Sequence, residues 1–393
     1  MSQSAVMNTY QRLPVTFHHG DGNYLFDTHG KRYLDALCGI SVTNLGHNHP
    51  AVTRAIKHQA ESLLHTSNLY HIEPQQKLAE TLCALSAMDN VFFSNSGAEA
   101  NEAAIKLARL YAHNAGNSNP MIMTMSNSFH GRTLATLTAT GNEKIKAGFG
   151  PLPPGFISAE YNNIDSAKQL FDQYKDSIAA VLIEPVQGEG GINPANHEYL
   201  QQLQQLCQQH HALFMLDEIQ TGNGRCGRYF AYQAIGLKPD VVTTAKGLGN
   251  GVPIGACLAS GKAAQTLVPG THGSTFGGNP LATAAALAVV ETIEAEQLDA
   301  RAAALGESII DGLKQALGGN AAVIDIRGMG LMLGIQLDRP CGQLVTDALN
   351  AGVLINVTAG SVVRLLPPLT LSDSEAKQLV VTVSELINQL TTA

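Results

Sequence analysis

Six short apolar runs, separated by segments of helical periodicity, restrict the fold of this chain more than any other feature. The runs contain almost no charged residue and lie at 91–94, 121–125, 179–183, 212–216, 241–245 and 255–259. Strands without charge are typical of a sheet covered on both faces, and segments such as 99–112 and 198–210 have the apolar spacing of amphipathic helices. This alternation predicts an α/β domain with a mainly parallel central sheet flanked by helices.

The sequence on either side of these runs predicts a second, smaller domain. A long helix with Pro280 in its first turn and a second helix to about Leu317 are followed by strand pairs with Gly turns and a final amphipathic helix. The first part of the chain contains a hairpin-like stretch, GDGNYLFDTHGKRYLDA, which we expect to join them. We therefore predict an N-terminal segment of the small domain at 1–55, a large domain at 56–295 and the rest of the small α+β domain at 296–393.

Composition fits a globular protein and argues against several classes of partner. Hydrophobic residues make up 45% of the chain and charged residues 14%, which is the balance of a protein with a large core. The net charge is −8 without a Lys/Arg cluster, so neither nucleic acid nor an anionic membrane is an expected partner. No apolar run reaches the ~18 residues of a membrane span, the first residues do not resemble a signal peptide, and the six cysteines form no C-x-x-C pair. We expect a cytoplasmic protein whose cysteines lie in its core.

Lys246 and Asp217 each follow an apolar run, at the place where α/β sheets bind their ligands. A lysine at a buried strand end loses solvation, and its amine then becomes a usable nucleophile for an aldehyde cofactor. A carboxylate at the end of a neighbouring strand could hold a pyridine nitrogen protonated, which is the arrangement expected for pyridoxal phosphate. On position alone, Lys246 could equally extend to solvent, and Asp217 could be a helix N-cap or part of a structural ion pair.

Two further places carry residues suited to a planar, anionic ligand. The segment SNSGA at 94–98 leads from a strand into a helix, so free backbone N–H groups and the helix dipole could hold a phosphate there. Phe129 could stack on a ring, and Arg132 could bind a carboxylate. An ordinary capped helix, a core phenylalanine and a surface arginine would give the same patterns.

Isolated charged residues and histidines give two more hypotheses. Arg364 lies within an apolar strand and needs an anionic partner or a ligand, and Glu184 and Glu189 are candidates. His47 and His49 form an H-x-H pair without an acidic or cysteine companion at ligand spacing, so we predict no metal site. A metal hydrolase that uses these histidines and Asp217 remains the alternative of a different class, and a binding protein without catalysis is a third.

Seven motifs occur along the chain in a fixed order. They are SNSGAEANEAAIKLAR, SFHGRT, IEPVQGEGG, LFMLDEIQTGNGRCG, TTAKGLGNGVPIGA, THGSTFGGNPLA and RLLPP. Together they resemble the class III aminotransferases of fold type I, which depend on pyridoxal phosphate (PLP), over nearly the whole chain. The resemblance implies the PLP-transferase fold, with a large domain around a mainly parallel sheet and a smaller α+β domain built from both termini. It also implies PLP as the cofactor and a homodimer.

The resemblance assigns roles to individual residues. Lys246 matches the lysine that binds the cofactor aldehyde covalently, and Asp217 matches the carboxylate that pairs with the pyridine nitrogen. The other implied cofactor contacts are Ser96, Gly97, Ala98, Phe129, Glu218, Ile219, Gln220 and Thr275, the last reaching across a dimer interface. The implied substrate contacts are Arg132, Ser274, Arg364 and Glu189, of which the last two resemble a pair that opens for the dicarboxylate co-substrate.

Within that family the sequence is most similar to enzymes that move the terminal amino group of N2-acetylornithine to 2-oxoglutarate, in arginine biosynthesis. Ile40 stands where ornithine δ-aminotransferases carry a tyrosine, which favours an acylated substrate. Transaminases of succinylornithine and succinyldiaminopimelate share the motifs, so these substrates and free ornithine remain alternatives.

Overall fold

A computed structural model of the chain, which describes residues 5–392, contains a central seven-stranded sheet. Its strands, in the order β4-β12-β11-β10-β7-β5-β6, are β4 (Asn90–Ser94), β12 (Gly255–Ala259), β11 (Val241–Thr244), β10 (Leu213–Asp217), β7 (Ile178–Ile183), β5 (Met121–Met125) and β6 (Phe156–Ala159). Neighbouring strands are parallel except around β12, which runs antiparallel to β11 and β4. The predicted α/β fold class with a mainly parallel sheet is confirmed.

The absence of charge from the predicted strands is explained by burial on both faces of the sheet. On β7, Val181 and Ile183 belong to one apolar cluster, while Ala180 and Leu182 belong to another on the opposite face. Helix α4 (Gly97–Asn114) supplies much of the second cluster and packs over β11 and β12. Strand β6 was not predicted because it is a partly exposed edge strand, and its sequence FISA is not a purely apolar run.

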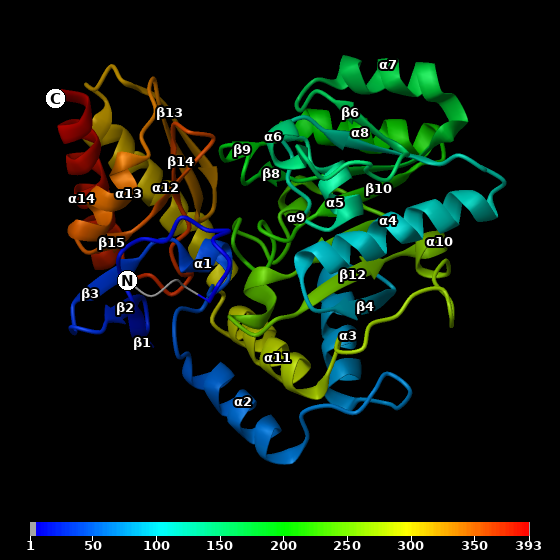
Figure 1. Ribbon diagram of the computed structural model, residues 1–393, viewed down its shortest axis with the longest axis horizontal. Coiled ribbons are helices and arrows are strands. Elements are labelled where there is room, and N and C mark those ends of the chain that lie inside the picture. Colours follow the sequence, from blue (N-terminus) through cyan, green and yellow to red (C-terminus); the bar gives the residue numbers. More distant parts are fainter. Residues whose placement is uncertain (1–4, 393) are drawn as a thin grey trace.

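Helices cover both faces of this sheet (Figure 1). Helices α7 (Ile164–Tyr174) and α8 (His197–Gln209) pack against each other near β6 and β10, away from α4. Helix α11 (Pro280–Ala295) packs against α2 (Pro50–Ser62) and α3 (Glu73–Ser86) below the sheet in the view of Figure 1. None of the described helices is long and apolar enough to cross a membrane.

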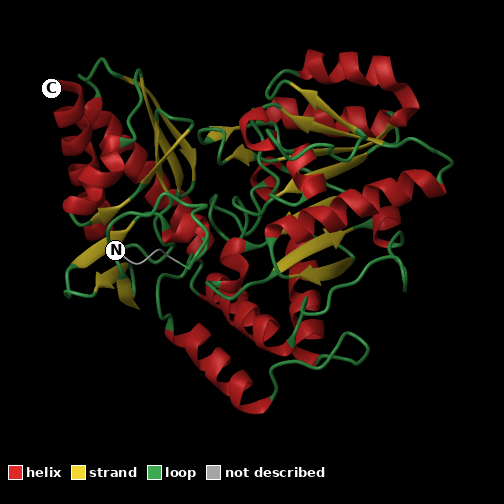
Figure 2. Cartoon of the chain, in the orientation of Figure 1, coloured by secondary structure: helices red, strands yellow, loops and turns green. Residues whose placement is uncertain are grey.

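The two ends of the chain meet beside the large sheet (Figures 1 and 2). Strands β1 (Phe17–Asp21), β2 (Tyr24–Asp27) and β3 (Arg32–Asp35) form antiparallel pairs, and β3 then pairs in parallel with β15 (Val353–Leu354). A second, antiparallel sheet has the order β13-β14-β17-β16. Its strands are β13 (Val323–Met329), β14 (Met332–Leu337), β17 (Val362–Leu365) and β16 (Asn356–Thr358). The N-terminal hairpin thus joins C-terminal structure, while the exact division at 55 and 295 stays a prediction.

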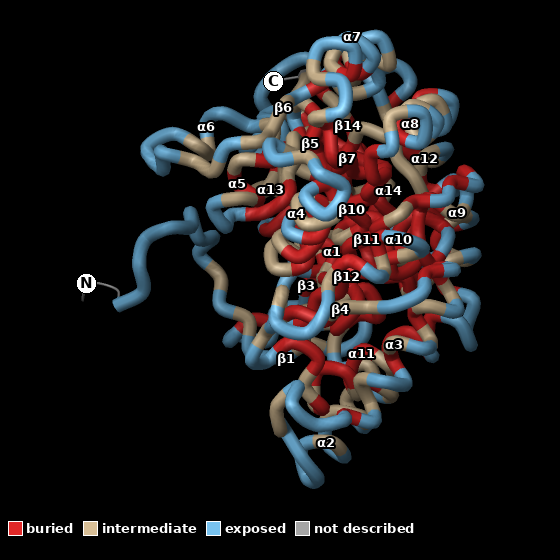
Figure 3. Tube along the Cα trace, turned by 90° about the vertical axis from the view of Figure 1, so that its right-hand side faces the viewer, coloured by how far each residue is buried: buried red, intermediate tan, exposed pale blue. Residues whose placement is uncertain are grey.

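Three helices accompany this smaller part of the molecule, and short elements complete the chain. The helices are α12 (Leu298–Leu317), α13 (Gln343–Asn350) and α14 (Asp373–Thr392). The short elements are α1 (Cys38–Ser41), α5 (Leu134–Ala139), α6 (Glu143–Lys146), the 3-10 turn η1 (Lys175–Ser177), β8 (Val186–Gln187), β9 (Asn193–Pro194), α9 (Tyr232–Ile235), the 3-10 turn η2 (Lys246–Gly249) and α10 (Gly261–Ala264). Figure 3 shows the buried strands at the centre of the molecule and the exposed segment before β1 extending away from it. Five of the six cysteines are buried and Cys83 is partly buried, as expected for core residues.

Candidate active site

A cavity of about 230 Å³ lies at the edge of the large sheet where its parallel strands end. Asp217 is the last residue of β10, Lys246 comes two residues after β11, and Glu184 follows β7 directly. Phe129, four residues beyond β5, also lines the cavity. The structure therefore brings together the two residues that the sequence placed at strand ends, because parallel neighbours end at the same edge.

Lys246 begins the 3-10 turn η2 with a left-handed backbone, at φ 45°. Its side chain lines the cavity and has no hydrogen bond to any residue of the described chain. Burial lowers the pKa of this amine, although the charges of Glu189 and Asp217 oppose the shift. A lowered pKa increases the fraction of neutral amine, which is the nucleophilic form.

Asp217 is held by three donors. Its Oδ2 accepts from Nδ1 of His130 at 2.7 Å and from Nδ2 of Asn101 at 2.8 Å, and its Oδ1 accepts from the backbone N–H of Ile219 at 3.1 Å. His130 is thus the structural partner of Asp217, and the two form an ion pair when the imidazole is protonated. We did not single out Asn101 from the sequence, although it is a polar residue on the buried face of an amphipathic helix.

The start of α4 forms the part of the cavity suited to a phosphate. Ser96 is the N-cap, and its side chain accepts from the backbone N–H of Glu99 at 3.2 Å. Gly97 and Ala98 line the cavity, whereas Ser96 is exposed beside it. A Cβ atom at Gly97 would lie 2.8 Å from Cγ2 of Ile219, so only glycine keeps this approach open without moving Ile219. An anion is favoured here by the free N–H groups of the 18-residue helix.

Phe129 and Arg132 lie on another wall of the same cavity. The Arg132 guanidinium sits 5.8 Å from the centre of the Phe129 ring, and its side chain is exposed to solvent. The backbone N–H of Phe129 donates to Oε2 of Glu184 at 3.0 Å. Glu184 is buried, and this burial raises its pKa to about 7. It holds the Phe129 loop rather than serving as the partner of Arg364.

Arg364 instead pairs with Glu189, at 2.6 Å between NH1 and Oε1. The guanidinium is fully buried, its Nε donates to Oδ1 of Asn356 at 3.0 Å, and its NH2 has no hydrogen-bond partner in the described chain. Burial opposes ionisation of Glu189, but the charge and hydrogen bond of Arg364 outweigh it and lower the pKa. Because the carboxyl pKa is lowered, the ion pair contributes its full stabilisation at pH values above the ordinary glutamate pKa. That contribution is lost as the pH falls through the lowered pKa.

Besides Ser96 and Arg364, three further predicted contacts do not line this cavity. Ser274 and Thr275 line a separate hollow with Asn95 and Phe276. The Glu218 carboxylate turns away and accepts the backbone N–H groups of Ala231 and Tyr232, at 3.1 and 2.9 Å. Its burial raises its pKa to about 7. The Glu218 side chain therefore fixes the neighbouring loop, and a contact of this residue with the cofactor stays a prediction.

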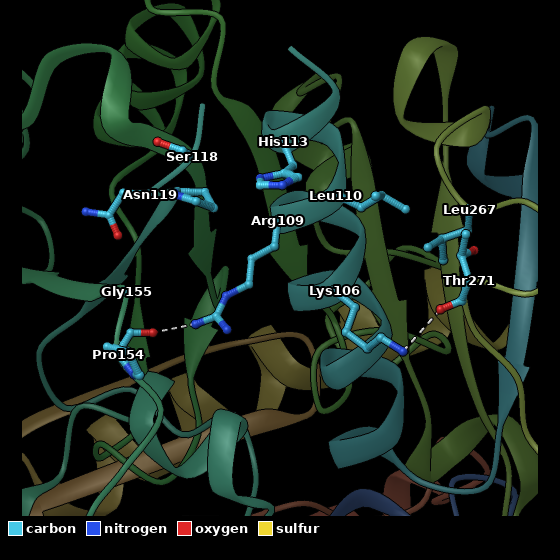
Figure 4. Close-up of a pocket in the computed structure, with 11 residues that line it drawn as sticks. Lys106, Arg109, Leu110, His113, Ser118, Asn119, Pro154, Gly155, Leu267 and Thr271 are labelled. Carbon is cyan, nitrogen blue, oxygen red and sulfur yellow. Dashed lines mark hydrogen bonds between the residues drawn. The ribbon is translucent and has the colours of Figure 1, made fainter. Parts of the chain in front are cut away.

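A larger hollow, of about 630 Å³, lies on the outer side of α4 (Figure 4). Lys106, Arg109 and His113 point toward it from successive turns of the helix, and Arg109 donates to the carbonyl of Pro154. No carboxylate or cysteine of the described chain lines it, so it offers no acid–base pair for catalysis. No three His, Cys, Asp or Glu residues between 5 and 392 gather as metal ligands, and His47 instead pairs with Asp35 at 2.8 Å.

The residues around the Lys246 cavity fit pyridoxal phosphate. Lys246 offers an amine without a hydrogen bond, and Asp217 offers a carboxylate that three protein donors hold in the cavity wall. Gly97 leaves space beside Ile219 at the helix start, where the phosphate would lie. The flat ring of Phe129 and the apolar side chain of Ile219 could enclose the cofactor ring between them.

Comparison with known families gives a match over nearly the whole chain. The family model described as aminotransferase class-III matches residues 5–387. A curated protein of Bordetella bronchiseptica, named acetylornithine aminotransferase 1, is 53% identical over 386 residues, which are 98% of each chain. The acetylornithine aminotransferase of Nitrosomonas europaea is 52% identical over 384 residues, again 98% of each.

Solved structures give the same match at the level of the fold. The ornithine aminotransferase of Toxoplasma gondii superposes with a TM-score of 0.95 at 32% identity, covering 98% of this chain and 93% of that one. The acetylornithine aminotransferase of Elizabethkingia anophelis has a TM-score of 0.87 at 31% identity, covering 98% of this chain and 96% of that one. A second Toxoplasma gondii structure, with a TM-score of 0.94, is reported with partial occupancy of PLP at its active site.

Proposed function

The chain belongs to the class III aminotransferases, and we propose that it exchanges the terminal amino group between N2-acetylornithine and 2-oxoglutarate. The products are N-acetylglutamate 5-semialdehyde and glutamate, and in arginine biosynthesis the net flow runs in the reverse direction. The observation that carries this proposal is the cavity shared by the desolvated amine of Lys246 and the three-times hydrogen-bonded carboxylate of Asp217. The names of relatives at 52–53% identity support the choice of substrate.

Lys246 and Asp217 have different proposed roles in proton transfer. When bound, PLP supplies an aldehyde that condenses with amines and a ring that accepts negative charge as a substrate proton leaves. Lys246 Nζ would act as the base that removes the proton from the substrate δ-carbon and would return it at the carbon that the cofactor aldehyde supplies. The Asp217 carboxylate would keep the ring nitrogen protonated, so that the ring stays electron-poor.

Two arginines are proposed to bind the carboxylates of the substrates. Arg132, exposed at the cavity wall, binds the α-carboxylate of acetylornithine, which acetylation leaves without a neighbouring ammonium. Arg364 is covered by Glu189 while a monocarboxylate is bound and is released when 2-oxoglutarate brings its second carboxylate. In this exchange the carboxylate of 2-oxoglutarate takes the place of the Glu189 carboxylate beside Arg364, so the guanidinium keeps an anionic partner.

Half-reaction rates on four amines test the proposed substrate. We expect the purified holoenzyme to convert N2-acetylornithine with a higher kcat/KM than succinylornithine, succinyldiaminopimelate or ornithine. Stopped-flow absorbance of the cofactor in single turnovers, without 2-oxoglutarate, measures each rate separately. A higher kcat/KM for ornithine would contradict the substrate choice. Loss of activity on chelation, with no bound chromophore, would favour the metal hydrolase.

Replacing Glu189 with glutamine should affect the two half-reactions unequally. Glutamine cannot neutralise the buried Arg364, so an unpaired cation faces the monocarboxylate substrate. We expect the acetylornithine half-reaction to slow by about tenfold or more, while the 2-oxoglutarate half-reaction changes much less. Glu198→Gln, at an exposed glutamate at the start of α8, is the matched control. Equal slowing of both half-reactions would contradict the exchange between Glu189 and the second carboxylate.

We also propose that the enzyme is a cytoplasmic homodimer in which Thr275 reaches the cofactor of the neighbouring subunit. Thr275 and Phe276 are exposed on a loop outside the Lys246 cavity, and Phe276 keeps 60% of its surface exposed although it is a large apolar side chain. A second copy would cover this loop. The six free cysteines support a reducing compartment. Sedimentation of the holoenzyme at micromolar concentration measures the assembly.

A further inference from the structure

Asp217 uses all but one of its hydrogen-bonding positions within the chain. An ionised carboxylate offers about four acceptor positions, two on each oxygen. Both positions on Oδ2 are taken, by Nδ1 of His130 at 2.7 Å and by Nδ2 of Asn101 at 2.8 Å. One position on Oδ1 accepts the backbone N–H of Ile219 at 3.1 Å. The single remaining position is therefore on Oδ1 of a side chain that lines the Lys246 cavity.

His130 is held through its backbone as well as through Nδ1 of its ring. Its backbone N–H donates to Oγ1 of Thr140 at 2.9 Å, and its carbonyl accepts from the same Asn101 amide that holds Asp217, at 2.8 Å. The other end of that amide, Oδ1, accepts from Oγ1 of Thr243 at 2.7 Å, which settles which end of Asn101 carries the donors. His130, Asn101 and Asp217 thus form a closed ring of contacts joining β10, α4 and the loop after β5.

The charges around His130 determine which of its nitrogens carries hydrogen. Because Oδ2 of Asp217 is an acceptor, Nδ1 of His130 must be the donor of their bond. The imidazole is fully buried, and its Nε2 has no partner in the described chain. Burial opposes a positive charge on the ring, but the hydrogen bond and charge of Asp217 and the charge of Glu184 outweigh it and raise the pKa. Lys246 is the remaining charged group that interacts with both carboxylates.

We propose that His130 is a positioning residue of the transamination site, whose Nδ1–H directs the one free acceptor position of Asp217 at the nitrogen of the cofactor ring. The inference rests on the proposed function. If the Nδ1–H donor were lost, Oδ2 would have a free position and the carboxylate could turn in its site. The ring nitrogen would then be held less firmly, whereas Arg132 and Arg364 would still bind the substrate carboxylates.

Two substitutions of His130 distinguish the effect of its Nδ1–H donor from the effect of the space that its ring fills. His130→Asn places an amide N–H near the position of Nδ1, and His130→Phe keeps a ring without a donor. For His130→Phe we expect the PLP dissociation constant of the apoenzyme to rise and kcat to fall, each by roughly 10- to 100-fold. The KM for acetylornithine should change little. His130→Asn should stay within roughly threefold of wild type in both. If His130→Phe does not fold, His130→Gln replaces it, because its amide mimics Nε2 rather than Nδ1.

Ser128→Ala is the control for disturbance of the loop. Ser128 is buried two residues before His130, but its Oγ accepts from the backbone N–H of Gly141 at 3.1 Å and does not contact Asp217. We expect the PLP dissociation constant of this variant to match wild type. Wild-type PLP affinity in His130→Phe, or equal impairment in His130→Asn and His130→Phe, would overturn the inference. A wild-type protein that binds no PLP would instead contradict the proposed function itself.

Discussion

Lys246→Ala is expected to lower kcat for acetylornithine by at least about three orders of magnitude, because the amine both carries the cofactor and moves the substrate proton. The substitution removes a side chain that has no hydrogen bond in the described chain, so no buried partner is left unsatisfied. We therefore expect the unfolding temperature of the apoenzyme to change little. A coupled glutamate assay measures the first quantity, and differential scanning calorimetry measures the second.

Lys262→Ala provides the matched control for this loss. Lys262 is an exposed lysine of α10, outside the cavity, so its removal changes the net charge by the same amount. We expect its kcat to equal that of wild type. A Lys246→Ala enzyme that kept a tenth or more of wild-type kcat would exclude Lys246 as the proton carrier.

Asp217→Asn is expected to lower kcat by about 10²- to 10³-fold, the usual cost of removing one preorganised charge from a reacting centre. Asparagine has the shape of aspartate but no negative charge, so it cannot keep a proton on the cofactor nitrogen. It would also leave His130 beside a neutral partner. Steady-state kinetics give the loss in kcat, and the pH dependence of the holoenzyme absorbance reports the state of the ring.

Asp240→Asn separates this effect from the general cost of altering a partly buried, hydrogen-bonded aspartate. Asp240 comes directly before β11 and accepts the backbone N–H of Phe214 at 2.8 Å, at the opposite edge of the same sheet. Burial raises its pKa, so the neutral amide is a mild change there. We expect lower stability from Asp240→Asn without a change in the cofactor spectrum. An Asp217→Asn enzyme with wild-type kcat would contradict the role of the carboxylate.

The strands of the large sheet and the points where they end could be predicted from the sequence, because strands buried on both faces exclude charged residues. Uncharged runs marked six of the seven strands of the large sheet, and the first ionisable residues after two of them, Asp217 and Lys246, do share a cavity. The need of Arg364 for an anion also followed from its position in an apolar strand, and it pairs with Glu189, one of the two candidates.

Contacts between residues distant in sequence, and unusual backbone conformations, could not be predicted because no local sequence pattern indicates them. The bond between His130 and Asp217 joins residues 87 positions apart in sequence, so no local pattern indicates it. The Cys38–Ser41 turn has positive φ at all four residues, although only Gly39 favours that region. Arg225, fully buried, stabilises the turn by donating from Nε to Oγ of Ser41 at 3.0 Å. Such a conformation is fixed by tertiary contacts and not by local preference.

Borohydride reduction of the yellow holoenzyme, followed by digestion and mass analysis, tests most directly whether the amine at position 246 holds the cofactor. Reduction fixes the cofactor aldehyde to whichever amine carries it. We expect the pyridoxyl mass on the peptide that contains Lys246 and on no other. A pyridoxyl adduct on a different lysine, or an unmodified Lys246 peptide from a fully loaded enzyme, would contradict the account.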